Sequence, residues 1–379
     1  MGKNIVVGQS GGPTAVINSS VAGVYSQAKK LGIDKVYGMV HGIEGFLEDQ
    51  ICDLDDYLAA PAGVEMLKRT PSAFLGSCRF KMPKIEGNEE VYEKIFEVME
   101  KHDIEYLFYC GGNDSMDTVK MLSDYAAAHG KSQRFVGVPK TVDNDLPITD
   151  HCPGYGSAAK YIATSLKEVI RDNSSFGAKK PTVVIVEIMG RNAGWLTAAA
   201  ALAKGPDCEG ADAIYLPERV FDIDKFVDKV KELSKTKSSI VIAVSEGVKL
   251  ADGRYVCEVG KEVAVDAFGH KQMSGTAVKL ADIVAEKTGL KTRAIEFSTL
   301  QRALASLTDI NEAFQVGADA VKAADAGKTA MMITLDRNGE NPYQCGTSAH
   351  DIHDIANVER KVPDEWITED GCGLTDDFE

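Results

Sequence analysis

The sequence has 379 residues, of which 44% are hydrophobic and 26% are charged, a composition typical of globular chains that bury two or more cores. Its formal net charge of −15 argues against a general basic surface for nucleic acid. The sequence has no secretory-peptide pattern and no apolar run close to the ~20 residues of a membrane helix. Its eight cysteines lack CxxC spacing. We therefore expect a cytoplasmic protein with reduced thiols and without nucleic-acid or membrane partners.

Several short runs rich in β-branched and aromatic residues are predicted to be strands, each followed by polar residues and then a helical pattern. In chain order they are residues 4–7, 104–110, 134–138, 182–188, 213–216, 239–244 and 293–297. This alternation predicts an α/β protein, and the polar motifs after the strands are expected to meet at one cleft. HCPGYG, at residues 151–156, is the expected boundary between two lobes, which could be interleaved. The polar tail, residues 368–379, is expected to be solvated or poorly ordered.

Two glycine-rich loops resemble phosphate sites. Gly11 and Gly12 follow the first predicted strand, before a helix expected from Thr14, and would let backbone N–H groups approach an anion. GGNDS, at residues 111–115, adds an acid and a hydroxyl suited to a phosphate held with Mg²⁺. Each loop alone could equally be a tight turn or a helix cap, but two in one chain favour phosphate.

The stretch PKTVDNDLP, residues 139–147, places Asp143 and Asp145 around Asn144 in an extended loop. One carboxylate could accept the proton of an attacking hydroxyl while the other helps to place a hydrated metal. Taken alone, the segment is as well explained by an Asp/Asn-rich turn.

Further candidates follow later strands. Arg191 and Arg302 could bind a phosphate monoester, Glu246 could accept bonds from sugar hydroxyls, and Arg79 is a further cation. The motifs GxxxxGK[ST], HRD with DFG, and GxGxxG are absent, which argues against the common nucleotide-kinase and dinucleotide sites. His350 and His353 are spaced for one helical face but lack a third ligand, so no metal site is expected there.

These motifs resemble the phosphofructokinases (family A), and within them the pyrophosphate-dependent branch. SGGPTAVIN, GSCRF, GGNDS, PKTVDND, VEIMGRNAGW, SEG and TRAIEFSTLQR occur in the family's order between residues 10 and 302. The resemblance implies two Rossmann-like three-layer lobes with mostly parallel sheets. Residues 1–154 with about 301–355 would bind the phosphoryl donor, and residues 155–300 with about 356–379 would bind fructose 6-phosphate. The implied reaction is reversible, Mg²⁺-dependent transfer from diphosphate to fructose 6-phosphate in glycolysis or gluconeogenesis, giving fructose 1,6-bisphosphate and phosphate.

The resemblance also implies roles for individual residues, with Asp143 as the base. The implied catalytic residues are Asp143, Asp114, Lys140 and Arg191; the donor site is Gly11, Gly12, Arg79, Gly112 and Ser115; the sugar-phosphate site is Thr141, Val142, Asp143, Met189, Gly190, Arg191, Glu246, Arg293, Thr299, Leu300, Gln301 and Arg302; and the metal ligands are Asn113 and Asp145. Arg293 would come from a neighbouring subunit of a homodimer or homotetramer.

Two positions are expected to select the donor. ATP-using members have glycine at the positions of Asp114 and Lys140; a carboxylate at 114 would occupy and repel the α-phosphate of ATP, and Lys140 would neutralise the leaving phosphate.

The chain departs from the family pattern at three points. Asn113 stands where an acidic metal ligand is usual, Thr299 stands where ATP-using relatives have histidine, and Lys179 or Lys180 would replace an arginine near Thr182. Effector-site arginines are absent from residues 17–25, so weak or no allosteric regulation is expected.

Two alternatives stay open at this point, namely an ATP-dependent sugar-phosphate kinase of the same fold and a non-catalytic sugar-phosphate sensor. The sequence does not decide the direction of the reaction or whether sedoheptulose 7-phosphate is an acceptor.

Overall fold

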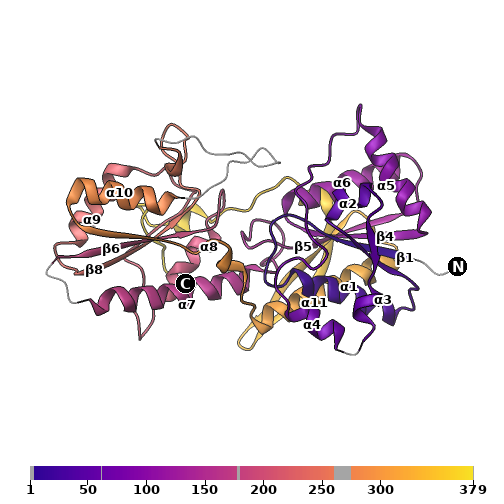
Figure 1. Cartoon of the computed structure of the whole chain (residues 1–379), viewed down its shortest axis with the longest axis horizontal. Coiled ribbons are helices and arrows are strands. Elements are labelled where there is room, and N and C mark those ends of the chain that lie inside the picture. Colours follow the sequence, from indigo (N-terminus) through magenta and orange to yellow (C-terminus); the bar gives the residue numbers. More distant parts are fainter. Residues whose placement is uncertain (1–3, 61, 177–179, 260–274, 379) are drawn as a thin grey trace. The chain divides into compact units, whose positions relative to one another are not determined.

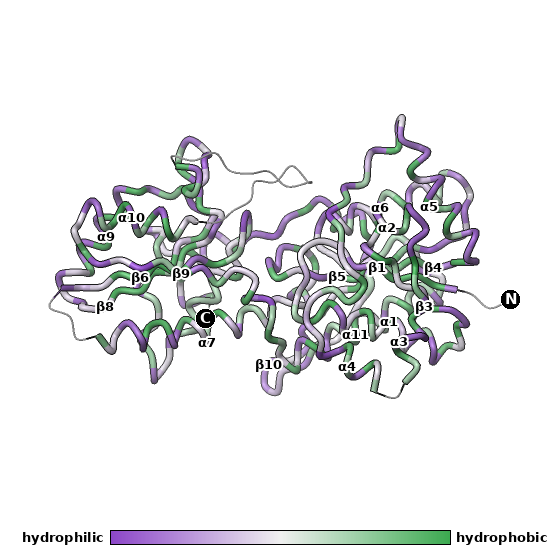
Figure 2. Tube along the Cα trace, viewed as in Figure 1, coloured by the Kyte–Doolittle hydropathy of each residue, from purple (hydrophilic) through white to green (hydrophobic). Residues whose placement is uncertain are grey.

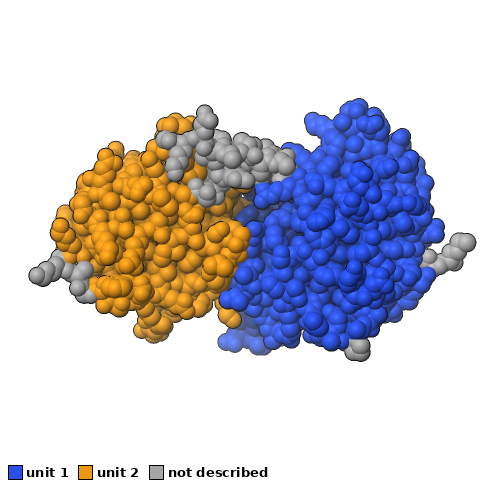
Figure 3. Space-filling view, viewed as in Figure 1, with its two compact units in different colours: residues 1–157, 302–359 blue, residues 158–301, 360–379 orange. Residues whose placement is uncertain are grey.

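The computed structural model describes residues 4–60, 62–176, 180–259 and 275–378. It divides into two compact units: unit 1 comprises residues 1–157 and 302–359, and unit 2 comprises residues 158–301 and 360–379 (Figure 3). The chain passes from unit 1 to unit 2 between Ser157 and Ala158, inside helix α7 (Tyr155–Ser175). A continuous helix therefore makes this connection, directly after the HCPGYG segment.

Unit 1 contains a seven-stranded sheet with strand order β11-β10-β5-β4-β1-β2-β3. Its strands are β1 (Asn4–Gln9), β2 (Val36–Met39), β3 (Ile51–Asp53), β4 (Ile104–Gly111), β5 (Arg134–Pro139), β10 (Met331–Glu340) and β11 (Tyr343–Asp351). Only the two edge strands, β3 and β11, pair antiparallel with their neighbours. β1, β4 and β5 therefore lie side by side and point the same way.

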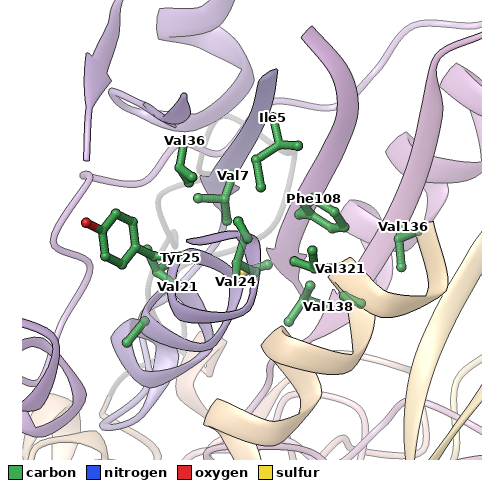
Figure 4. Packing of buried hydrophobic residues seen from close by; sticks show 14 of the residues in the cluster. Ile5, Val7, Val21, Val24, Tyr25, Val36, Phe108, Val136, Val138 and Val321 are labelled. Carbon is green, nitrogen blue, oxygen red and sulfur yellow. The ribbon is translucent and has the colours of Figure 1, made fainter. Parts of the chain in front are cut away.

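Helices cover both faces of this sheet, so unit 1 has three layers (Figure 1). They are α1 (Ile17–Lys30), α2 (Gly42–Leu47), α3 (Asp55–Leu58), α4 (Gly63–Arg69), α5 (Glu89–Lys101), α6 (Asn113–Ala128) and α11 (Leu307–Asp325), with the short 3-10 helix η4 (Ile352–Asp354). On one face, side chains of β1, β4 and β5 pack against α1 and α11 (Figure 4). On the other face the core is completed by α2, α5 and α6.

Unit 2 contains a four-stranded parallel sheet with order β7-β8-β6-β9. Its strands are β6 (Thr182–Ile188), β7 (Ala213–Tyr215), β8 (Ser239–Ser245) and β9 (Lys291–Glu296); its helices are α8 (Trp195–Ala198), α9 (Ile223–Leu233), α10 (Thr276–Thr288) and most of α7, with the 3-10 turns η1 (Ala199–Ala203), η2 (Val256–Glu258), η3 (Ser298–Arg302) and η5 (Asp364–Trp366). α9 and α10 supply the core on one face. Green stretches run through the interior of each unit in Figure 2, with purple on many outer turns.

The α/β class and every strand predicted from the sequence are confirmed, whereas β2, β3, β10 and β11 were not predicted. Three smaller expectations are wrong. The first helix begins at Ile17, not Thr14, because residues 11–16 form the loop. His350 lies in β11, so it shares no helical face with His353. The tail is folded, since Ile214 N donates to Cys372 O at 3.0 Å and Cys372 packs on the core of unit 2.

Among the helices in the described residues, none combines the length and apolar composition needed to cross a bilayer.

Candidate active site

Three of the predicted polar loops are neighbours at one edge of the unit 1 sheet. They follow β1, β4 and β5, which are adjacent and parallel. Backbone bonds join their ends, because Ser10 N donates to Cys110 O at 2.9 Å and Lys140 N donates to Gly111 O at 3.0 Å. The sheet therefore brings together SGGP, GGNDS and PKTVDND, as expected for a ligand site at the carboxyl ends of parallel strands.

The loop after β1 lies against the segment that carries Arg79. Gly11 has a φ of +73°, a conformation that favours glycine, and its N–H donates to Cys78 O at 3.0 Å. Ser77 Oγ donates to Gly11 O at 2.6 Å. Gly11 and Arg79, both predicted to bind the phosphoryl donor, thus lie on two backbone segments that are hydrogen-bonded to each other.

The loop after β4 opens helix α6. A Cβ on Gly111 would lie 1.9 Å from Ser115 Oγ, so glycine is required for the close turn. Asp114 is exposed in the first turn of α6, where a carboxylate is favoured by the helix dipole. Asn113 already has protein partners: its Oδ1 accepts from Asn357 N at 2.7 Å and its Nδ2 donates to Val358 O at 2.7 Å.

Lys140 is the most unusual side chain of the three loops, because it is an ammonium with only 4% of its surface exposed. Its Nζ donates to Gly12 O at 2.8 Å and would lie 3.3 Å from a Cβ on Gly11. The pKa of Lys140 is lowered to about 8, chiefly by burial; the negative charge of Asp143 opposes the shift, and the positive charge of Arg302 adds to it. The loop after β5 therefore carries a desolvated cation to the glycines after β1.

The two aspartates lie just beyond this lysine. Thr141 Oγ1 accepts from Asp143 N at 3.0 Å, and Asn144 adopts a φ of +54° with its Oδ1 accepting from Cys152 N at 2.9 Å. Burial, and then the negative charge of Asp143, raise the pKa of Asp145 to about 7. Asp145 Oδ1 is buried and has no hydrogen-bond partner among the described residues.

A Mg²⁺ ion fits this pair of aspartates better than it fits Asn113, since an orphaned carboxylate oxygen can accept a metal whereas the Asn113 oxygen is already bonded. The described part of the chain contains no group of three or more His, Cys, Asp or Glu side chains able to hold a metal. A metal at this pair would take its other oxygens from phosphate and water.

A second set of predicted residues gathers in unit 2, after the adjacent strands β8, β6 and β9. Gly190 has a φ of +137°; its carbonyl accepts from Ser245 Oγ at 2.5 Å, and its N–H donates to Glu246 Oε1 at 3.4 Å. Gln301 is buried, and its Oε1 accepts from Met189 N at 3.1 Å. The structure thus joins the MGR, SEG and STLQR motifs through direct hydrogen bonds.

The arginines of unit 2 differ in their surroundings. Arg191 Nε is buried and, within the described residues, has no hydrogen-bond acceptor, which leaves it able to serve an anion. Arg293 is exposed on the edge strand β9, where its NH1 lies 3.7 Å from Asp172 Oδ2. Thr299 and Leu300 are exposed, and Lys180 is exposed while Lys179 lies outside the described residues.

The remaining predicted residues lie in unit 1. Thr141 and Val142 are buried. Arg302 approaches the loop after β1, because a Cβ on Gly12 would lie 2.4 Å from its NH1. The roles of all these residues stay predictions. The predicted donor residues all lie in unit 1, whereas the predicted sugar-phosphate residues are divided, with Thr141, Val142, Asp143 and Arg302 in unit 1 and the others in unit 2.

Two acidic residues that shape the unit 2 set were not identified from the sequence. Glu187 Oε2 accepts from Ala277 N at 2.9 Å at the start of α10. Glu218 Oε1 accepts from Gly194 N at 2.7 Å and from Val362 N at 3.1 Å. Glu187 stands two residues before Met189 and could have been noticed there, but nothing in the sequence around Glu218 indicates its distant partners.

Comparison with known proteins gives concordant matches. The family model described as phosphofructokinase matches residues 4–324. A protein of Methylococcus capsulatus named pyrophosphate--fructose 6-phosphate 1-phosphotransferase is 41% identical over 379 residues, covering 99% of this chain and 89% of the relative. A protein of Alkalicoccus urumqiensis named sulfofructose kinase is 30% identical over 370 residues, covering 96% and 92%.

Among solved structures, a pyrophosphate-dependent phosphofructokinase from Nitrosospira multiformis superimposes with a TM-score of 0.88 at 41% identity, covering 99% of this chain and 89% of that one. Because the family model matches most of the chain and the relatives span nearly all of it, the protein belongs to the phosphofructokinase family.

Proposed function

We propose that the protein is a pyrophosphate:fructose 6-phosphate 1-phosphotransferase that transfers a phosphoryl group reversibly between diphosphate and the 1-hydroxyl of fructose 6-phosphate. The observation that carries the proposal is Lys140, a buried ammonium bonded to the glycine loop after β1. Burying a cation costs free energy. The positive charge of Lys140 at this place is suited to a small, highly charged phosphoryl donor such as diphosphate. The names of the relatives support the same donor and acceptor.

Asp143 accepts the proton of the attacking hydroxyl in this proposal. It follows Lys140 in the same loop and is half-buried, so its carboxylate can be held in place while substrate reaches it. The 1-oxygen forms the new P–O bond, the bridging bond of diphosphate breaks, and the charge on the departing phosphate is neutralised by Lys140. In unit 2, Arg191 offers its unpartnered Nε to the 6-phosphate. Mg²⁺ held by Asp145, whose Oδ1 is the orphaned oxygen, would supply charge neutralisation on the phosphate oxygens.

Asp114 would exclude nucleotide donors. It stands exposed in the first turn of α6, beside the glycines proposed to bind the donor. A carboxylate at that place would repel a third phosphate group, whereas diphosphate requires no room there.

The assignment of substrates to units follows from the same residues. Unit 1 would bind diphosphate and unit 2 would bind fructose 6-phosphate. Arg293 lies on the exposed edge strand β9, which is compatible with its donation to a neighbouring subunit in a homodimer or homotetramer. We also propose a cytoplasmic location, which is supported by the eight cysteines, all of them free thiols.

The deciding experiment is a steady-state assay with diphosphate or ATP as donor, in both directions, with Mg²⁺ present and absent. Fructose 6-phosphate, sedoheptulose 7-phosphate and sulfofructose should be compared as acceptors, the last because of the Alkalicoccus relative. We expect turnover with diphosphate and fructose 6-phosphate, and a fall of roughly 10²- to 10⁴-fold in Asp143→Asn. Turnover with ATP alone would favour the kinase alternative; sugar-phosphate binding without turnover, unchanged in Asp143→Asn, would favour the sensor.

A further inference from the structure

Two fully buried side-chain amides flank the glycine loop after β1. Gln9 is the last residue of β1 and Asn18 lies in the first turn of α1, and neither side chain has exposed surface. Gln9 Nε2 donates to Asn18 Oδ1 at 2.9 Å. The pair therefore closes the base of the loop that contains Gly11 and Gly12.

The same two amides also hold a distant part of the chain. Leu75 N donates to Gln9 Oε1 at 2.9 Å, and Phe74 N donates to Asn18 Oδ1 at 2.8 Å. Asn18 Nδ2 donates to Thr70 O at 2.9 Å, at the end of α4. Moving this segment would leave buried donors and acceptors unpaired, which is far more costly than sliding apolar side chains.

The held segment leads directly into the backbone that meets the glycine loop. After Leu75 the chain turns at Gly76, which has a φ of +74° and no room for a Cβ, because one would lie 2.4 Å from His41 Nδ1. Ser77 and Cys78 then make the two bonds to Gly11 described above. Arg79 follows at once, so its origin is fixed relative to Gly11 by the amides upstream.

We propose that Gln9 and Asn18 are positioning residues that set the geometry between Gly11 and Arg79 for binding the phosphoryl donor. This inference rests on the proposed function, in which Gly11 and Arg79 contact diphosphate. Apolar side chains could fill the same space beside the core of α1. They would lack the directional hydrogen bonds that hold the backbone of residues 70–75 in one position. The use of two satisfied amides at this place is explained by the precision that the adjoining loops require.

The test uses Gln9→Met and Asn18→Leu, which keep volume and remove the bonds, together with Ser77→Ala, a mild change that folds even if the core variants do not. We expect the KM for pyrophosphate to rise roughly tenfold in each, while kcat at saturating pyrophosphate and the KM for fructose 6-phosphate stay within roughly twofold. The double variant Gln9→Met with Asn18→Leu should show less than the product of the single effects, because both changes release the same segment.

Asn173→Leu is the matched control. This amide is also buried, but it lies in unit 2, where its Nδ2 donates to Ser239 Oγ at 2.7 Å. We expect the control to lower Tm about as much as Asn18→Leu without changing the KM for pyrophosphate.

Equal changes in both KM values and in kcat, or an unchanged KM for pyrophosphate in all three test variants, would overturn the inference. If the wild type shows no turnover, the same variants are titrated with pyrophosphate by calorimetry: weaker binding in the variants sustains the inference while the proposed reaction fails. If the wild type does not bind pyrophosphate, both the inference and the proposed function are wrong.

Discussion

Lys140→Met should stabilise the protein and abolish its use of diphosphate. The side chain is buried, and its pKa is lowered from 10.5 to about 8 in the folded chain. A lowered lysine pKa means that keeping the ammonium charged at neutral pH destabilises the folded state. Methionine has a similar shape and carries no charge, so the substitution removes that cost together with the cation that the donor requires.

The magnitude follows from the shift in pKa. A shift of one pKa unit corresponds to about 1.4 kcal/mol. Lowering the pKa of Lys140 from 10.5 to about 8 therefore corresponds to roughly 3 kcal/mol of unfolding free energy. Loss of the hydrogen bond from Lys140 Nζ to Gly12 O lowers the stability and offsets about 1 kcal/mol of this gain. We therefore expect Lys140→Met to be about 1–3 kcal/mol more stable than the wild type at pH 7.

The pH dependence has a definite sign. Between pH 8 and pH 10.5 the unfolded chain binds more protons at residue 140 than the folded chain does, so the stability of the wild type rises with pH in that window. The advantage of Lys140→Met should therefore shrink as pH rises above 8.

Urea unfolding at pH 7 and pH 9.5, combined with diphosphate kinetics, checks the prediction. Lys231→Met, at an exposed lysine of α9, is the control. It should change neither the unfolding free energy nor the rate of diphosphate turnover appreciably. A variant at residue 140 that is less stable than the wild type at both pH values, or that keeps diphosphate turnover, would refute the reasoning.

Three further predictions concern stability. Gly111→Ala places a Cβ 1.9 Å from Ser115 Oγ and should lower the unfolding free energy by about 1–3 kcal/mol in urea titrations, whereas Gly112→Ala, whose Cβ would meet its nearest atom at 3.6 Å, should be nearly neutral. His151 lies between Asp150 and Glu312 at 2.8 and 2.9 Å; burial lowers its pKa, but these bonds prevail and raise it to about 9, so its stabilisation is full below pH 6.5 and lost as pH passes 9. His151→Gln should thus be less stable than the wild type at pH 6 by urea unfolding, with the difference gone by pH 9.5; a constant difference would contradict this. Asp309 accepts from Gly154 N and Ser157 N through different oxygens, so Asp309→Asn should lower Tm by several degrees, whereas Asp222→Asn, whose single oxygen caps α9, should not; equal Tm losses would count against this account.

The sequence predicted those parts of the fold that depend on local composition. Buried parallel strands such as residues 182–188 are mostly apolar runs and are easily seen. The β10–β11 hairpin was missed because its outer half, from Asp336 to Gln344, is polar and exposed and lacks that signal. The tail was misjudged because a few contacts, such as that of Cys372, anchor an otherwise polar segment.

The candidate site was predictable to the extent that motifs follow strands. Once residues 104–110 and 134–138 are identified as parallel strands, the loops beyond them must share an edge of the sheet. The sequence could not predict ties between residues far apart in the chain, such as Gln9 with Leu75 or Asp309 with Gly154. Each such tie depends on the orientation of one side chain in the assembled core, which composition and spacing do not specify.

The charges in the unit 1 loops explain how a chain with a net charge of −15 can receive a polyanion. Lys140, with a pKa of about 8, and Asp145, with a pKa of about 7, are both close to their midpoints near neutral pH, so neither charge is firmly held without a ligand. A diphosphate beside Lys140 would favour its charged form, whereas a cation at Asp145 would favour the carboxylate. Each ligand would thus complete the ionisation of the group that it contacts, so the binding of diphosphate at Lys140 is expected to take up protons and the binding of a cation at Asp145 to release them.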